Sequence, residues 1–240
     1  LSGRPTGKVN QATIIANMEP VEREYMLYLP LYDGVVSLSI GIDEQASISV
    51  PRKAIPVRTK PIVFYGTSIL QGGCANRPGM AHTNIISRRL NREIINLGFS
   101  GNALLDYEIA EVMSSVDAGV YVLDFVPNAS SDQIYEKMET FYRILRDKHP
   151  RTPIIFIEDP VFTHALFDKK IAIEINKKNK AVNSVFRSLK TKGEKNIYMI
   201  SSEKMLGEDG EATVDGIHFT DLGMMRYADL VCPVIKKVLK

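Results

Sequence analysis

The chain of 240 residues has no tryptophan, two cysteines, four histidines and no long apolar run. No stretch approaches the roughly 18 apolar residues that a bilayer-spanning helix needs, so we expect no transmembrane segment. Cys74 and Cys232 are far apart and match neither a metal-ligand spacing nor a CxxC redox motif. We interpret them as two free thiols and leave a disulfide between them open.

The chain also has no large excess of positive or negative charge. The formal net charge is +2, from 30 basic and 28 acidic residues, which argues against nucleic acid and anionic membrane surfaces as partners. The chain starts at Leu1 and has no signal-peptide pattern, so we expect a trimmed or processed product whose compartment its start does not reveal. Hydrophobic content of 45% and charged content of 24% are typical of a globular protein.

The character of the sequence changes near Pro61. Before it, short apolar runs alternate with turn residues, and Ser37–Ile40 and Ser47–Val50 alternate polar with apolar side chains, as half-buried strands do. Asp33-Gly34 between two runs indicates a hairpin. We therefore predict a small antiparallel β unit over residues 1–57, short enough to be the remnant of a larger β domain.

After Pro61, apolar runs alternate with helical patterns over residues 61–240. This alternation predicts an α/β domain in which a five-stranded parallel, flavodoxin-like sheet lies between two layers of helices. The predicted strands are 62–65, 93–97, 120–125, 153–158 and 196–200. The predicted helices are 82–91, 105–114, 132–148, 171–192 and 221–238.

Ligands of such sheets bind outside the carboxyl ends of the strands. Ser68 follows the first strand within Gly66-Thr67-Ser68, where a turn would expose its hydroxyl. A serine hydroxyl needs a base, and histidine is the usual one because its pKa lies near neutrality. Of the four histidines, only His218 has a carboxylate three residues before it, Asp215, which can fix the tautomer of the ring.

The other histidines have other interpretations. His149 ends a helix, His82 opens one near Ser68, and His164 lies in a loop after the fourth strand, so the last two could line the site. Taken alone, Asp215-Gly216 is also a common turn dipeptide, and His218 could be a surface residue before a helix. The position of Ser68 at the same sheet edge favours a Ser68–His218–Asp215 triad.

An acyl-transfer site also needs hydrogen-bond donors for the oxyanion. The candidates are the backbone N–H of Ser68, the N–H of Gly101 in the loop after the second strand, and the side chain of Asn128 after the third. Gly101 could equally be a loop glycine, and Pro127-Asn128 a turn.

These segments resemble those of the SGNH hydrolases, the GDSL lipase/acylhydrolase superfamily. Gly66-Thr67-Ser68 resembles its Gly-Asp-Ser, residues 96–102 its glycine segment, Asn128 its asparagine, and Asp215–His218 its Asp-x-x-His. Thr67 stands where the family has aspartate, and Phe125–Asn128 lacks the glycine and the trailing aspartate of the third segment. The N-terminal run Glu24–Pro30 resembles the β-rich accessory domain that precedes the hydrolase domain in one branch of the superfamily.

The resemblance implies a serine esterase with Ser68 as nucleophile and no metal or organic cofactor. Its substrate would be a small acyl ester, such as an acetyl group on a carbohydrate, and its setting bacterial and extracytoplasmic, secreted or periplasmic. The altered third segment keeps a second hypothesis open, a catalytically weak or inactive glycan-binding module. A flavodoxin-like nucleotide or phosphate site is a third, but it gives Asp215 and His218 no role.

Residues 70 and 72–74 argue against two further classes of protein. The nucleophile elbow of α/β-hydrolases needs glycine at position 70, where this chain has Leu70. A P-loop needs Gly-Lys-Ser/Thr, which Gly72-Gly73-Cys74 does not supply. The sequence does not indicate an oligomeric state.

Overall fold

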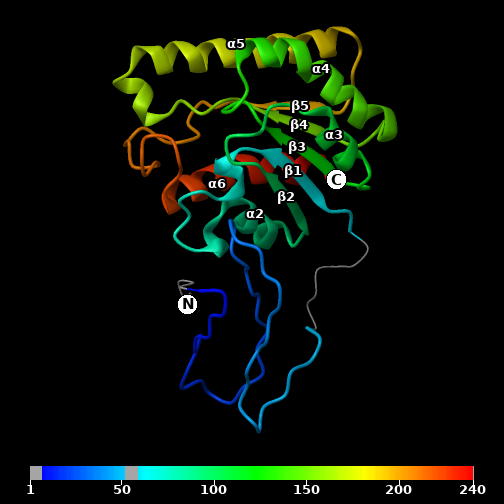
Figure 1. Ribbon diagram of the computed structural model, residues 1–240. Helices are drawn as coiled ribbons and strands as arrows, with labels where there is room; N and C mark the ends of the chain where they lie inside the picture. Colours follow the sequence, from blue (N-terminus) through cyan, green and yellow to red (C-terminus); the bar gives the residue numbers. More distant parts are fainter. Residues whose placement is uncertain (1–6, 52–58, 240) are drawn as a thin grey trace.

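A parallel β-sheet forms the centre of the molecule in a computed structural model, which describes residues 7–51 and 59–239 (Figure 1). Its strands lie in the order β2-β1-β3-β4-β5, and every neighbouring pair is parallel. They are β1 (Ile62–Gly66), β2 (Ile94–Gly98), β3 (Val120–Asp124), β4 (Ile154–Ile157) and β5 (Ile197–Ile200). The α/β class predicted from the sequence is confirmed.

Helices cover both faces of this sheet, which gives three layers (Figure 1). Helices α2 and α6 pack together on one face, and α3, α4 and α5 lie on the other. The helices are α1 (Ser68–Gln71), α2 (His82–Leu90), α3 (Tyr107–Ser114), α4 (Ser131–Lys148), α5 (Lys169–Thr191) and α6 (Asp221–Val238), with 3-10 turns at Pro78–Met80 and Thr163–Leu166. Among the described residues, no helix is long and apolar enough to cross a bilayer.

The sequence of β1 explains the two-sided burial. Ile62 and Phe64 point to the cluster that holds α2 and α6, while Val63 and Tyr65 join the cluster of α3, α4 and α5. All four side chains are fully buried, as expected for a strand covered on both faces. Side chains alternate along a strand, so one apolar run supplies both cores.

The long helices begin at capping residues. Ser130 and Gln133 form a reciprocal capping box at the start of α4. The Asp168 side chain accepts hydrogen bonds from the Lys170 and Ile171 amides at the start of α5, and the Thr220 side chain accepts one from the Gly223 amide at the start of α6. These caps place the helix starts within about two residues of the positions that the sequence predicts.

The N-terminal part differs from the prediction. Residues 7–51 contain no helix or strand, so the described part of the predicted β unit is not formed. The chain runs out and back as extended arms, away from the body of the molecule (Figure 1). Leu38 and Ile40, on the apolar side of a predicted strand, are 56% and 62% exposed. An isolated hairpin is marginally stable in water, and here no described residue covers its apolar face.

Candidate active site

Ser68 is the first residue of α1, directly after β1 ends at Gly66. The turn between them is tight: a Cβ at position 66 would lie 2.5 Å from the Asp124 carbonyl oxygen, which only glycine avoids. Thr67 is the N-cap of α1, and its Oγ1 accepts a hydrogen bond from the Ile69 amide. Aspartate and threonine both cap helices, so Thr67 can fill the local role of the aspartate that it replaces.

Three side chains from segments far apart in the sequence form one hydrogen-bonded row. Ser68 Oγ lies 2.9 Å from His218 Nε2, although 150 residues separate the two. His218 Nδ1 lies 2.7 Å from Asp215 Oδ2. The carboxylate is therefore on one side of the imidazole and the hydroxyl on the other. In this arrangement a ring can take a proton from a hydroxyl while a carboxylate stabilises the resulting cation.

The Asp215 carboxylate is held by more than the ring. Its Oδ1 accepts hydrogen bonds from the backbone amides of His218, at 2.7 Å, and Ile217, at 3.0 Å. Burial raises the pKa of Asp215, but the hydrogen bonds from the His218 ring and from the two amides outweigh it and bring this pKa to about 2. Asp215 is therefore an anion at neutral pH.

A short loop fixes the spacing of the acid and the histidine. Thr213 pairs with Phe219 in an isolated bridge, and the Val214 amide donates to the His218 carbonyl oxygen at 2.8 Å. Gly216, with φ at +88°, makes the turn between them. The His164 ring lies 3.3 Å from the position that a Cβ on Gly216 would occupy. His164 therefore packs over this loop.

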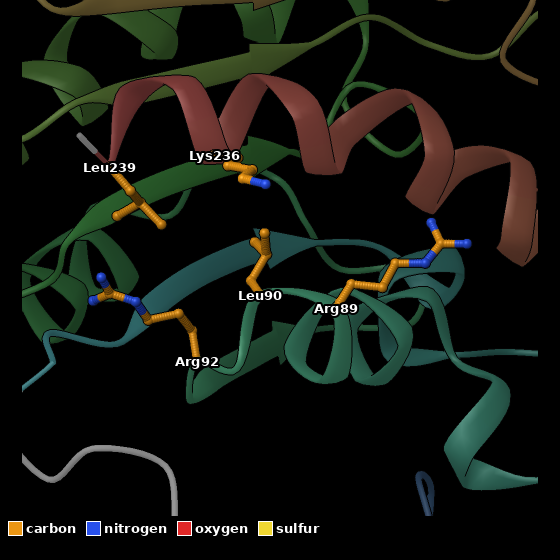
Figure 2. A pocket seen from close by; sticks show the side chains of 5 residues that line it. All are labelled: Arg89, Leu90, Arg92, Lys236 and Leu239. Atoms are coloured by element: carbon orange, nitrogen blue, oxygen red, sulfur yellow. The ribbon is translucent and has the colours of Figure 1, made fainter.

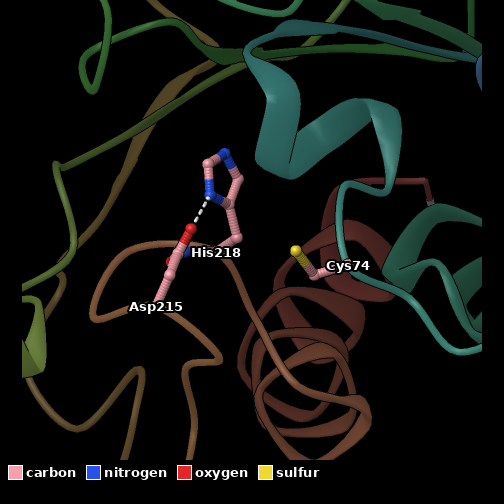
Figure 3. Close-up of side chains that lie close together, drawn as sticks. All are labelled: Cys74, Asp215 and His218. Carbon is pink, nitrogen blue, oxygen red and sulfur yellow. Dashed lines mark hydrogen bonds and ion pairs between the residues drawn. The ribbon is translucent and has the colours of Figure 1, made fainter.

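Cys74 approaches the same residues from the loop after α1, opposite Asp215 (Figure 3). Ligand atoms of Cys74, Asp215 and His218 lie within 4.8 Å of one another, and each belongs to a type that binds transition metals. Burial and the nearby Asp215 raise the pKa of the Cys74 thiol, which disfavours the thiolate that a metal needs. The hydrogen bond between His218 and Asp215 instead favours a proton-transfer arrangement. Cys74 and Cys232 are both free thiols.

Gly101 lies in a tight turn after β2. The Asn102 amide donates to the Phe99 carbonyl oxygen at 3.0 Å, and Gly101, at φ +72°, occupies the position that favours glycine. No described group accepts a hydrogen bond from the Gly101 N–H. The adjacent Ser100 N–H donates to Gln71 Oε1 at 3.2 Å, which ties this turn to α1.

Asn128 is half-buried at the end of the segment that follows β3. Its side-chain Oδ1 accepts a hydrogen bond from the Ala103 N–H at 3.3 Å. This contact fixes one end of the amide and leaves its NH₂ end as the donor. The loops that carry Gly101 and Asn128 are thus in contact.

His82, which the sequence allowed as a site residue, is instead part of the core. It is fully buried and packs on Tyr227, with ring centroids 4.0 Å apart. Burial lowers the pKa of His82 to about 3, so the ring is neutral. Tyr227 donates to Asp124 Oδ2 at 2.7 Å, and burial raises the pKa of Asp124 to about 7. Neighbouring Asp159 also has a pKa raised by burial to about 7, partly offset by Lys178.

Tyr32 and Leu31, which the sequence did not single out, contact α1. Tyr32 Oη donates to the Ser68 carbonyl oxygen at 3.3 Å, and Gln71 Nε2 donates to the Leu31 carbonyl oxygen at 3.2 Å. Their positions depend on the path of an N-terminal segment without regular structure. No periodicity or motif in the sequence signals them.

A separate hollow of about 380 Å³ lies at the other end of the sheet (Figure 2). Its lining comes from the end of α2, the turn before β2 and the end of α6: Arg89, Leu90, Arg92, Lys236 and Leu239. The lining is basic, but Arg89 is already paired with Asp229 at 2.7 Å. Because Ser68 follows the carboxyl end of β1, this hollow is not part of the candidate site.

Comparison with known proteins gives two matched segments. The profile of the GDSL-like Lipase/Acylhydrolase family matches residues 59–236, and the profile of the N-terminus of SGNH-hydrolase-type esterases matches residues 2–48. No curated protein matches the chain significantly.

Solved structures share the fold. One described as a GDSL-like lipase from Bacteroides ovatus is 40% identical, with a TM-score of 0.83 over 88% of this chain and 62% of that one. A salicylyl-acyltransferase from a tetracycline biosynthetic pathway is 18% identical, with a TM-score of 0.64 over 73% of this chain and 54% of that one. A family two carbohydrate esterase from Clostridium thermocellum is 16% identical, with a TM-score of 0.58 over 74% and 64%.

The chain thus spans less than two thirds of the length of these structures. The family profile, however, covers most of this chain, including the strands, helices and loops that bring Ser68, His218 and Asp215 together. The chain belongs to the GDSL-like lipase/acylhydrolase family of SGNH hydrolases.

Proposed function

We propose that the protein is a serine esterase that hydrolyses a small acyl ester through Ser68, His218 and Asp215. The observation that carries the proposal is the hydrogen-bonded row of these side chains, with contacts of 2.9 and 2.7 Å. A serine hydroxyl is a weak nucleophile, and this arrangement supplies the base and the anion that activate it.

Each atom of the row has one task. Ser68 Oγ attacks the ester carbonyl carbon, and its proton passes to His218 Nε2. The tetrahedral intermediate collapses when His218 returns that proton to the oxygen of the leaving alcohol, which leaves an acyl group on Ser68. Water then attacks the acyl-enzyme with His218 again as the base, and the acid product departs.

Asp215 keeps the ring in the productive tautomer. Its carboxylate accepts the Nδ1 proton, so the neutral ring presents an unprotonated Nε2 to Ser68. Since the pKa of Asp215 is about 2, the anion persists while the imidazolium forms. Asp215 therefore remains ionised throughout the cycle.

Three donors are proposed for the oxyanion: the N–H groups of Ser68 and Gly101 and the side-chain NH₂ of Asn128. Ser68 is the first residue of α1, where an amide has no intrahelical acceptor. The Gly101 amide has no acceptor among the described residues, and Ala103 orients the Asn128 amide. One such donor typically contributes about 10²–10³ in rate.

The substrate class extends the proposal. We propose an acetyl ester of a carbohydrate, because fold neighbours include structures described as carbohydrate esterases. We also propose the division into an N-terminal unit, residues 1–57, and a hydrolase domain, residues 61–240, and an extracytoplasmic setting. Fractionation of cells that produce the full-length protein tests the location.

Hydrolysis of 4-nitrophenyl acetate tests the activity. We expect turnover by the wild type and background rates for Ser68→Ala. Ser115→Ala is the matched control, because this exposed serine follows the last residue of α3 and its hydroxyl donates only to the Val112 carbonyl oxygen. A fluorophosphonate probe should label the wild type at Ser68 but not Ser68→Ala. Equal, background-level rates in wild type and Ser68→Ala would instead favour the non-catalytic glycan-binding module.

A further inference from the structure

One short stretch of the N-terminal segment, residues 28–32, lies against the candidate site. Within residues 7–51, Tyr28 and Leu31 are half-buried and every other residue is exposed. Figure 1 shows this stretch at the point where the N-terminal arms meet the body of the molecule. Its contacts with the hydrolase domain concentrate on α1, α2 and the loop between them.

Two residues, Leu31 and Tyr28, anchor this stretch. The Leu31 carbonyl oxygen accepts from Gln71 Nε2, and the Leu31 side chain fills the space beside Gly72, where an added Cβ would lie 2.6 Å from Leu31 Cδ1. Arg88 donates to Tyr28 Oη at 3.0 Å, and its guanidinium lies 5.3 Å from the centre of the Tyr28 ring. Together these contacts combine hydrogen bonds, apolar packing and a cation–π pair.

The anchors bring Tyr32 to the nucleophile. Tyr32 Oη donates to the Ser68 carbonyl oxygen. A Cβ built on Gly73 would lie 3.0 Å from both Tyr32 Oη and that carbonyl oxygen, and 3.3 Å from His218 Cδ2. Because residue 73 has no side chain, Tyr32 Oη, the Ser68 carbonyl oxygen and the edge of the His218 ring lie close together around it.

Tyr32 Oη thus lies on the Cδ2 side of the His218 ring. In imidazole, Cδ2 is bonded to Nε2, the atom that must protonate the leaving oxygen. The Tyr32 hydroxyl donates its one proton to the Ser68 carbonyl oxygen, so the lone pairs of Oη can accept a hydrogen bond from a substrate hydroxyl. The ring of Tyr32 is also an amphipathic surface of the kind that suits a sugar face.

We propose that Tyr32 is a specificity-determining residue that binds the alcohol half of the ester and selects leaving groups with free hydroxyls. The inference rests on the proposed function and deepens it, since it gives the N-terminal segment a part of the substrate site. It predicts that Tyr32 matters for an acetylated sugar and not for an ester whose leaving group has no hydroxyl neighbour.

The test compares two substrates in three proteins. Tyr32→Phe removes the hydroxyl and keeps the ring. We expect kcat/KM for an acetylated methyl glycoside to fall about 3- to 10-fold, mainly through KM, the range of one neutral hydrogen bond. The value for 4-nitrophenyl acetate should stay within about twofold by the same reasoning. Tyr25→Phe is the control, because Tyr25 is exposed and its hydroxyl contacts only Met18 in the same segment.

The outcomes separate the inference from the proposed function. An equal loss on both esters would overturn the inference and make Tyr32 a positioning residue that acts through the Ser68 carbonyl. An active wild type with no effect of Tyr32→Phe on either ester would overturn it as well. If the wild type hydrolyses neither ester, the proposed function fails, and the inference fails with it.

Discussion

Replacement of Asp215 by asparagine should reverse the proton distribution on the His218 ring. In the wild type, Asp215 Oδ2 accepts the Nδ1 proton, and Oδ1 accepts the amides of His218 and Ile217. In Asp215→Asn, the amide oxygen can keep both backbone hydrogen bonds, which places its NH₂ group against Nδ1. Two donors cannot face each other, so the ring proton should move to Nε2 and point at Ser68.

The magnitude follows from that tautomer. A ring that is protonated at Nε2 cannot take the Ser68 proton, and the loss of the carboxylate also removes the charge that stabilises the imidazolium. We expect kcat for 4-nitrophenyl acetate to fall about 10³- to 10⁴-fold, or about 4–5.5 kcal/mol in activation free energy. Because the backbone contacts can survive, we expect the melting temperature to change little.

Two measurements make this reasoning refutable. Asp215→Asn should lose activity with nearly unchanged thermal unfolding, whereas a loss of less than about tenfold would contradict the tautomer argument. In the wild type, the pKa of Asp215 is about 2, so its protonation cannot shape the acid limb of the pH profile at pH 5 to 7. That limb should therefore show no contribution from Asp215, and a second-order acid dependence would contradict this assignment.

Three further substitutions probe the surroundings of the row. Gly73→Ala places a Cβ 3.0 Å from the Ser68 carbonyl oxygen, so kcat/KM should fall at least about tenfold, while Gly41→Ala, in open space, should be neutral in the same assay. Asp124→Asn should raise the melting temperature relative to wild type more at pH 8 than at pH 5. The folded protein holds a proton on Asp124 up to about pH 7, whereas the unfolded chain releases it near 3.8, so the wild type loses up to about 4 kcal/mol of stability as the pH rises between these values. An equal difference in melting temperature at both pH values would contradict the raised pKa. Thr67→Ala should cost about 0.5–2 kcal/mol in chemical denaturation, and Thr67→Ser much less, because only serine keeps the cap; equal costs would rule out the capping role.

The hydrolase domain was predictable because its local signals agree. The apolar run of β1 and its neighbours, the helix caps and the strand–helix alternation all indicate one fold, and the observed strands lie within one residue of the predicted ones. The same logic predicted that Ser68 and His218 would meet, because loops at the carboxyl ends of parallel strands share one edge. Their hydrogen bond spans 150 residues of sequence.

The remaining features depend on contacts that sequence patterns do not encode. Helix α1 has four residues, too few to display a helical period, and it is stabilised by the Thr67 cap and a left-handed Gly72. The alternation at Ser37–Ile40 has the period of a strand, but a strand needs a partner, and the described chain offers none. The position of Tyr32 depends on Leu31 and Gln71, whose contact follows from the path of an irregular segment.

The two departures from the family pattern have local structural substitutes, and this bears on how strong a catalyst Ser68 can be. Thr67 supplies the cap that orients α1, so the amide of Ser68 stays at the first turn of the helix. At the third segment, the Ala103 N–H holds the Asn128 amide by its oxygen, and Ala103 follows directly on the turn that carries Gly101. One loop therefore presents one proposed oxyanion donor and orients another. Gln71 fixes that loop to α1 through the Ser100 amide while its other end holds Leu31. Gln71 thus links the helix of the proposed nucleophile, the oxyanion loop and the N-terminal segment. A shift of the N-terminal segment should therefore change the rate of acyl transfer and not only substrate binding.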